Sequence, residues 1–131
     1  MIVLDASAVL DLLLRTPEGL LLEGRIFAPG ETLHAPHLID VEVARVLRRY
    51  TMLGDLSALR AGQALDDLAD LPISRYPHYL LLPRIWELRD NVTAYDAAYI
   101  ALAEALPAPL LTRDRSLASA PGHAAAVELV G

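Results

Sequence analysis

The sequence predicts an α/β fold in which helices cover both faces of a mostly parallel β-sheet. Short apolar runs typical of strands alternate with longer segments whose apolar residues recur at helical spacing, which is the pattern of successive βαβ units. The 131 residues match one compact domain, and their 54% hydrophobic content is enough for a buried core. We therefore expect a single domain over residues 1–131 with a sheet of five strands.

The first half of the chain is predicted to contain two strands and four helices. The strands are residues 2–4 and 32–35, and the helices are residues 7–14, 18–27, 37–53 and 55–71. Pro29 and Gly30 indicate a turn before the second strand, and Gly54 is expected to end the third helix. The third helix is amphipathic, with apolar residues at helical spacing. These residues are Ile39, Val43, Val46, Leu47 and Tyr50.

The second half of the chain is predicted to add three strands and three helices. The strands are residues 72–75, 109–112 and 126–130, and the helices are residues 78–89, 93–106 and 114–119. Pro83 lies inside the first of these helices, so we expect a kink or a later helix start there. The helix at 93–106 is strongly apolar.

Composition excludes several classes of protein. Asp5, Asp11 and Arg15 interrupt the apolar N-terminal stretch, and no later run reaches the roughly 18 uncharged residues that a membrane span needs. That stretch also has no basic leader, which a secretory signal requires. Without cysteine, disulfides and thiolate zinc sites are excluded, so we expect a cytoplasmic protein with no membrane partner. All 11 basic residues are arginine, which excludes chemistry that depends on an active-site lysine.

Four acidic residues lie where the predicted structure changes from strand to helix, or in the first turn of a helix. They are Asp5, Glu42, Asp96 and Asp114. Ligands of parallel α/β sheets bind beyond the carboxyl ends of the strands, so these acids can meet in one site although they are far apart in sequence. Clustered metal ligands also offer an explanation for the net charge of −6, which otherwise argues against a nucleic-acid partner.

Each of these acids also has a structural explanation. Asp5 and Asp114 are suited to cap helices, Asp96 follows Thr93 as the acidic member of a capping box, and Glu42 can pair with Arg45. A carboxylate directly after an apolar run is costly unless it is paired or metal-bound, and Asp5 is such a case.

Asp40 competes with Glu42 for the second position of the acidic set. Two residues of a helix that are separated by two positions point about 200° apart, so only one of them can face the site. Glu42 lies on the face of Arg45 and Arg49, and Asp40 suits an N-cap. We therefore favour Glu42.

Four segments together resemble the motif blocks of PIN domains, and specifically of VapC-type toxins. They are VLDASAVLDLLL, LIDVEVARVLRR, LRDNVTAYDAAYIALAEAL and LLTRDRSLA, which occur in the order and spacing of that family. The resemblance implies a Rossmann-like α/β/α sandwich, Mg²⁺ or Mn²⁺ at the acidic cluster, endoribonuclease activity on RNA, a homodimer, and inhibition by a cognate VapB-type antitoxin. It assigns catalysis and metal binding to Asp5, Glu42, Asp96 and Asp114, and polar support positions to Ser7, Asn91, Thr93 and Thr112.

The implied chemistry suits these residue types. Mg²⁺ prefers hard oxygen ligands and keeps several waters when it binds to protein. One ion would activate a water for in-line attack and a second would stabilise the leaving 3′ oxygen, which gives products with a 5′-phosphate and a 3′-hydroxyl.

Two alternative functions remain open at this stage. His34 and His37 lie close together in sequence and suggest a metal-independent ribonuclease, although Pro36 between them disfavours a shared helical face. We expect these two residues to line a loop, and His78 and His123 to be solvated. The other alternative is a non-catalytic PIN-like binding module, in which the acids only cap helices.

Two further segments are candidates for binding partners. Arg45, Arg48 and Arg49 form a basic turn beside Glu42 that is suited to RNA phosphate, or else to a solvated face. Leu20, Leu21 and Leu22 form an apolar run too wide for one helix face, so we expect an antitoxin helix or a second subunit to cover part of it. The antitoxin is expected to insert a basic residue toward the acidic cluster.

Overall fold

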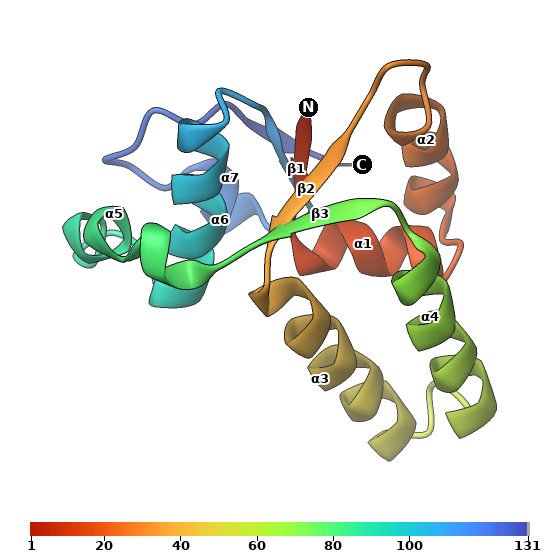
Figure 1. The fold of residues 1–131 in the computed structure, drawn as a ribbon. Coiled ribbons are helices and arrows are strands. Elements are labelled where there is room, and N and C mark those ends of the chain that lie inside the picture. The colour runs from red at the N-terminus through yellow and green to blue at the C-terminus, as the bar shows by residue number, and fades with distance from the viewer. Residues whose placement is uncertain (131) are drawn as a thin grey trace.

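A five-stranded, all-parallel sheet forms the centre of the computed structural model, which describes residues 1–130 (Figure 1). Its strands are β1 (Ile2–Leu4), β2 (Leu33–Pro36), β3 (Ile73–Tyr76), β4 (Leu110–Thr112) and β5 (Val127–Leu129). The order across the sheet is β3-β2-β1-β4-β5. The chain first adds β2 and β3 on one side of β1 and then returns to add β4 and β5 on the other. The direction therefore reverses between β1 and β4, and ligands of such sheets bind at this reversal.

Helices cover both faces of the sheet. The first three strands are connected by α1 (Ala6–Leu13), α2 (Pro17–Ile26), α3 (Leu38–Met52) and α4 (Ala58–Asp70). The remaining connections contain η1 (His78–Leu80), α5 (Leu82–Glu87), α6 (Ala94–Ala105) and α7 (Arg115–Ala118). Right-handed crossovers place the first group on one face and the second on the other. In Figure 1, α3 and α4 extend side by side beyond the sheet, and α5, α6 and α7 lie together on the opposite side of the molecule.

The core is built from β1 and α6. All three residues of β1 are buried, as expected for a central parallel strand that is covered on both faces. In α6 the run from Ala97 to Ala103 is buried without interruption, and its alanines let the helix approach β1 and β2 closely. No helix among residues 1–130 combines the length and the apolar character that a bilayer crossing requires.

Side-chain caps fix where several helices begin. Asp5 caps α1, Thr93 caps α6 and Asp114 caps α7, each by accepting a hydrogen bond from a backbone N–H of the first turn. Thr16 caps α2, and Gly19 in the same turn lies so close to α1 that an added Cβ would be 2.0 Å from the carbonyl oxygen of Asp11.

The predicted fold class, the order of elements and the later helix start at Pro83 are confirmed: residues 78–80 form a 3₁₀ turn, and α5 begins at Leu82 with Pro83 in its first turn. Two local expectations are wrong. Asp40 does not cap α3, because it forms a two-bond ion pair with Arg75 (2.8 Å for each bond). His34 does not line a loop, since it lies in β2 and is buried.

Arg84 ties α5 and α6 to the C-terminal segment. Its Nε and Nη2 donate to the two carboxylate oxygens of Glu104 at 2.8 and 3.0 Å, and Nη2 also donates to the carbonyl oxygen of Gly122. Glu104 accepts a further hydrogen bond from the backbone N–H of Ala124 at 2.9 Å. The Arg84 hydrogen bonds hold the pKa of Glu104 below its ordinary value.

We predict that Arg84→Gln lowers the free energy of unfolding by about 1 kcal/mol at neutral pH. A carboxyl group with a lowered pKa in the folded state stabilises that state above its unfolded pKa, which is 4.5 for Glu104, and the contribution is lost as the pH falls through the folded pKa. Urea unfolding of both proteins at decreasing pH should therefore show a shrinking difference. Arg89→Gln is the control, because exposed Arg89 stacks on exposed Trp86 and should change stability by less than about 0.5 kcal/mol. If the difference in unfolding free energy between Arg84→Gln and the parent protein stayed constant with pH, the stabilisation could not come from the pairing of Arg84 with Glu104.

Candidate active site

Asp5 occupies the end of β1, on the β1 side of the reversal between β1 and β4. Its side chain is only 7% exposed, and it accepts hydrogen bonds from Ser7 Oγ (2.6 Å), from the backbone N–H of Ala8 (3.0 Å) and from Thr112 Oγ1. Burial raises the pKa of Asp5, and these hydrogen bonds oppose that rise. The carboxylate is thus held in one orientation from three sides.

Ser7 and Thr112 link the ends of β1 and β4 through this carboxylate. Thr112 Oγ1 donates to Asp5 and accepts from the backbone N–H of Asp114 at 2.9 Å. Ser7 Oγ donates to Asp5 and accepts from the backbone N–H of Arg113 at 2.9 Å. The loop that follows β4 is therefore positioned by the two hydroxyl groups.

Asp96 and Asp114 bring two more carboxylates to this region. Asp96 lies half-buried in the first turn of α6, and its pKa is raised first by burial and then by the negative charges of Asp114, Glu42 and Asp5. Asp114 is exposed, and hydrogen bonds from Ser116 lower its pKa. All four predicted acids therefore lie close enough to act on one another electrostatically.

Glu42 reaches the region from α3 and is held by a tyrosine that the sequence did not single out. Tyr99 Oη donates to Glu42 Oε1 at 2.6 Å, and the ring is only 2% exposed. Burial, followed by the hydrogen bond to Glu42, raises the pKa of Tyr99 well above its ordinary value. Tyr99 lies one helical turn after Asp96, a spacing that would have indicated a shared face, but a tyrosine in an apolar helix is also a common core residue.

Within the described part of the chain the four carboxylates have no cationic partner, in contrast to three other acids. Among residues 1–130, none of the four forms an ion pair within 4.0 Å, whereas Asp11, Asp40 and Glu104 are each paired with an arginine. The chain therefore leaves a concentrated negative charge uncompensated at the carboxyl ends of β1 and β4. A divalent cation supplies the counter-charge that such a region lacks.

The donor set fits Mg²⁺ or Mn²⁺ in its chemistry, since every candidate ligand is a hard carboxylate oxygen. No group of three or more His, Asp and Glu side chains within residues 1–130 is arranged to hold one ion. Three of the four carboxylates accept side-chain hydrogen bonds from protein here: Asp5 from Ser7 and Thr112, Glu42 from Tyr99, and Asp114 from Ser116. Mg²⁺ is usually held by one or two carboxylates together with waters and substrate phosphate, so a pair of these carboxylates suffices.

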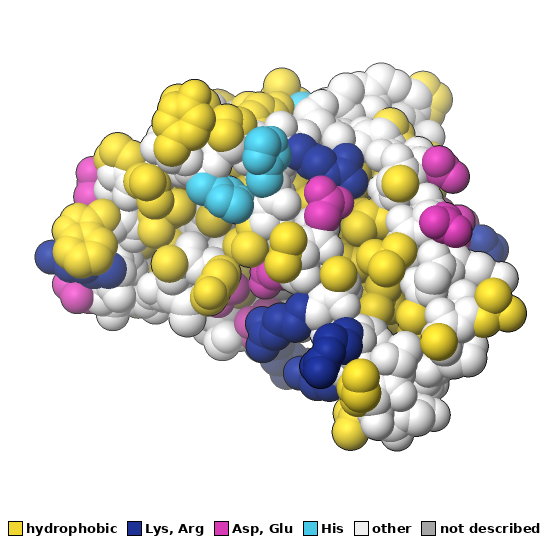
Figure 2. Space-filling view, turned by 60° about the horizontal axis from the view of Figure 1, so that its bottom comes forward, with side chains coloured by type: hydrophobic (Ala, Val, Ile, Leu, Met, Phe, Trp, Pro, Cys, Tyr) yellow, Lys and Arg dark blue, Asp and Glu magenta, His cyan; other side chains and the backbone are white. Residues whose placement is uncertain are grey.

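The remaining predicted polar residues lie around this centre. Asn91 and Thr93 line an open hollow of about 480 Å³ together with Asp96. The arginines of α3, Arg45 and Arg49 among them, form no ion pair in the described part of the chain. Figure 2 shows arginine side chains gathered beside a hollow in which acidic side chains are visible.

Three of the four histidines have side-chain hydrogen-bond partners, which their sequence positions did not reveal, and His37 lies in the turn after β2 as expected. His34 uses both ring nitrogens, one with Thr32 Oγ1 (2.8 Å) and one with Tyr76 Oη (2.6 Å). His78 is not simply solvated, because its Nε2 accepts from the backbone N–H of Leu38 at the start of α3. His123 Nδ1 accepts from the N–H of Ala125, and its Nε2 is buried.

Comparison with known proteins places this geometry in a family. The PIN domain matches residues 2–122. Ribonuclease VapC1 of Mycobacterium tuberculosis is 45% identical over 130 residues, which are 98% of this chain and 96% of the relative. Ribonuclease VapC12 of the same organism is 42% identical over 99% of both chains. The crystal structure of VapBC2 from Rickettsia felis, bound to a DNA fragment from their promoter, shares the fold with a TM-score of 0.68, 14% identity and full coverage of both chains.

The sequence identity extends over nearly the whole chain, and it agrees with the fold and with the grouping of acids where the strand order of the sheet reverses. On these grounds the chain belongs to the PIN-domain family and, within it, to the VapC-type ribonucleases.

Proposed function

We propose that this chain is a metal-dependent endoribonuclease and the toxin of a toxin–antitoxin pair, and that it acts as a single PIN domain in the cytoplasm. The observation that carries the proposal is the uncompensated group of carboxylates around Asp5 and Asp96 at the reversal of the sheet. The similarity to ribonucleases VapC1 and VapC12 supports the reaction and the RNA substrate.

In this proposal each residue has a defined task. Asp5 and Asp96 hold Mg²⁺ or Mn²⁺, and Asp114 and Glu42 complete the negative field. Ser7 and Thr112 fix the Asp5 carboxylate through their hydroxyl groups. Asn91 and Thr93 line the hollow beside Asp96, where they are available to a substrate phosphate. When bound, the cation supplies an activated water and neutralises charge on the phosphate.

We predict that Asp96→Asn lowers the rate of RNA cleavage by about 100-fold or more. Without metal the variant should be at least as stable as the parent protein. The folded state raises the pKa of Asp96, so the ionised carboxylate opposes folding and its neutral replacement removes that opposition. Added Mn²⁺ should raise the melting temperature of the parent protein and have little effect on the variant.

Asp66→Asn is the matched control, because Asp66 is an exposed acid on α4. It should leave cleavage and the response to Mn²⁺ unchanged. Cleavage by Asp96→Asn at the parent rate would remove Asp96 from the site. A parent protein that binds RNA but never cuts it would favour the non-catalytic binding module.

A further prediction separates metal-dependent cleavage from a histidine mechanism. EDTA should abolish cleavage, Mg²⁺ or Mn²⁺ should restore it, and the products should carry 5′-phosphate and 3′-hydroxyl ends. A histidine mechanism has little support here, since both ring nitrogens of His34 are engaged by protein. End-group analysis of the products decides the matter, and cyclic phosphate ends formed in EDTA would refute metal dependence.

The partner in this proposal is a VapB-type antitoxin that covers the exposed part of the leucine run on α2. Leu22 is buried at 6% exposure, but Leu20 and Leu21 are 48% and 78% exposed. Leu21 and Leu22 border a hollow of about 200 Å³ beside β5, which is suited to the apolar face of a helix. A basic antitoxin residue would reach toward the unpaired carboxylates. We also propose that the toxin forms a homodimer.

We predict that the chain co-purifies with the product of the small reading frame beside its gene, and that the complex cuts RNA much more slowly than the free chain. Leu21→Asp should weaken the complex by at least about tenfold, because it places a charge in an apolar contact. Leu59→Asp on α4, where the leucine is 75% exposed, is the matched control and should bind normally. If the complex cut RNA as fast as the free chain, the toxin assignment would be wrong. The assignment as a PIN-domain ribonuclease would still hold.

A further inference from the structure

A second hollow, of about 430 Å³, lies between α1 and α3 and adjoins the candidate active site at Ser7. The two share Ser7, whose hydroxyl donates to Asp5 and also lines this hollow. Leu10, Leu14 and Val46 contribute its apolar part. The hollow is therefore an apolar recess that opens beside the carboxylates.

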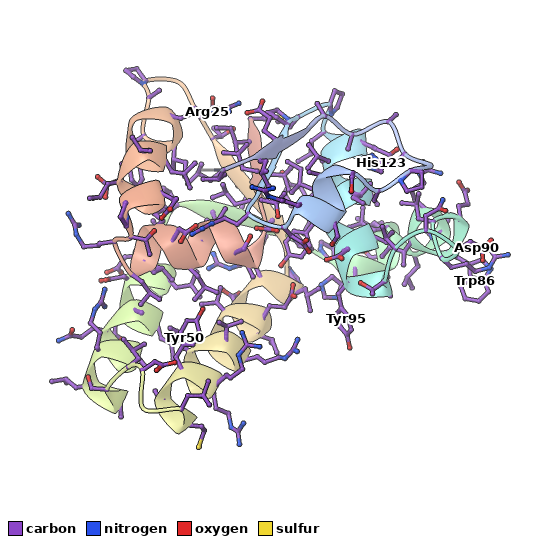
Figure 3. The ribbon with its side chains drawn as sticks, turned by 180° about the vertical axis from the view of Figure 1, so that it is seen from behind. Arg25, Tyr50, Trp86, Asp90, Tyr95 and His123 are labelled. Carbon is purple, nitrogen blue, oxygen red and sulfur yellow. The ribbon has the colours of Figure 1, made fainter. Side chains whose placement is uncertain are left out.

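An aromatic ring, two guanidinium groups and the buried Asp11 carboxylate also line the hollow. Tyr50 lies below α1, in the angle between α3 and α4 (Figure 3). Arg49 stands next to it, with Cζ 5.9 Å from the centre of the Tyr50 ring. Arg113 reaches the hollow from the loop after β4. An apolar recess with an aromatic ring and guanidinium groups has the chemistry that binds a base and its phosphate.

Arg113 is held in place for such a task. Its Nη1 donates to both carboxylate oxygens of Asp11, at 2.9 and 3.1 Å, and Asp11 is itself fixed by the Thr16 hydroxyl at 2.9 Å. These hydrogen bonds use one of the three guanidinium nitrogens. The other two carry three N–H donors that suit a phosphate.

The charge pattern of α3 also indicates an anionic ligand. Arg45, Arg48 and Arg49 stand within two helical turns and form no ion pair within residues 1–130, although the chain carries a net charge of −6. Like charges at this spacing repel one another in the folded protein. An anionic partner along α3 would remove this repulsion.

From these observations we propose that the hollow between α1 and α3 binds one unpaired nucleotide of a single-stranded RNA, next to the bond that is cut. The base lies against Tyr50 and the apolar recess, and Arg49 and Arg113 hold the adjoining phosphate. The proposal rests on the ribonuclease function proposed above, and it assigns one nucleotide-binding position beside the cleavage point to residues of α1, α3 and the loop after β4. A base in a duplex is stacked and paired, so it does not enter a recess of this kind.

RNA suits this hollow better than a segment of a basic antitoxin. Arg113 is paired with Asp11 and Glu18. Arg49, however, has no ion pair within residues 1–130 and repels a cationic side chain, whereas the carboxylates beyond Ser7 attract one. The hollow therefore favours an anionic group, such as a phosphate of the substrate. The carboxylates favour a cationic group, such as the basic residue of an inhibitor.

The test measures binding of a fluorescein-labelled single-stranded RNA 12-mer of random sequence to the full chain in EDTA, over a range of salt concentrations. Tyr50→Leu should weaken binding about 5- to 100-fold, and Tyr50→Phe should bind like the parent protein because it keeps the ring. Arg49→Gln should weaken binding and reduce the slope of log affinity against log salt by about 0.7, the value for one phosphate contact. Arg48→Gln removes the same charge from α3 outside this hollow, and should have the smaller effect.

Two further arms make the test decisive. Leu14→Trp fills the recess and leaves Tyr50 and both arginines in place, so it should weaken binding even if Tyr50→Leu folds poorly. A fully paired RNA of the same length should show no dependence on Tyr50. Equal losses for Arg48→Gln and Arg49→Gln, or normal binding by Leu14→Trp, would overturn the proposal. The proposal would also be overturned if these variants bound RNA normally but no longer bound the antitoxin, because the hollow would then be an antitoxin-binding site. RNA that is cut in EDTA would instead overturn the proposed metal dependence and leave the hollow standing.

Discussion

The burial of a single carboxylate at the end of the central strand determines how the rest of the site is arranged. Asp5 follows three buried residues of β1, and its charge must be compensated inside the protein. The chain does so with hydrogen bonds, from Ser7 and Ala8 of the next helix and from Thr112 of the neighbouring strand. One requirement thereby fixes the start of α1, the end of β4 and the path of the loop between β4 and α7.

The distribution of partners among the acids separates structure from proposed function. Asp11, Asp40 and Glu104 are each paired with an arginine, so their charges stabilise the fold. Within residues 1–130, Asp5 and Asp96 have no arginine partner, and burial raises the pKa of both. Unpaired, partly buried carboxylates oppose folding, and such groups are typical of sites where a ligand binds. The arginines of α3 show the complementary pattern, because no carboxylate of residues 1–130 pairs with them and they lie beside the same region.

The sequence predicted those features of the site that depend on neighbouring residues in the chain. Asp5, Asp96 and Asp114 stand at strand ends or helix starts, and the alternation of elements is enough to bring such positions together at one edge of a parallel sheet. Contacts between distant segments were not predictable in this way. Tyr99 meets Glu42 across 57 positions, and Arg113 meets Asp11 across 102. The choice between Asp40 and Glu42 also depended on Arg75, 35 positions away, which takes Asp40 for an ion pair.

The close approach of α2 to α1 has a consequence for how the protein tolerates change. Any side chain at Gly19 would meet the backbone of Asp11, which cannot move without displacing Arg113 and the wall of the hollow beside the site. In a population that survives only by losing the proposed toxicity, Gly19 is therefore a second target for mutation, remote from the carboxylates and as vulnerable as they are. Such escape variants would retain every acidic residue of the motif, so an intact motif in a natural sequence does not by itself identify an active toxin.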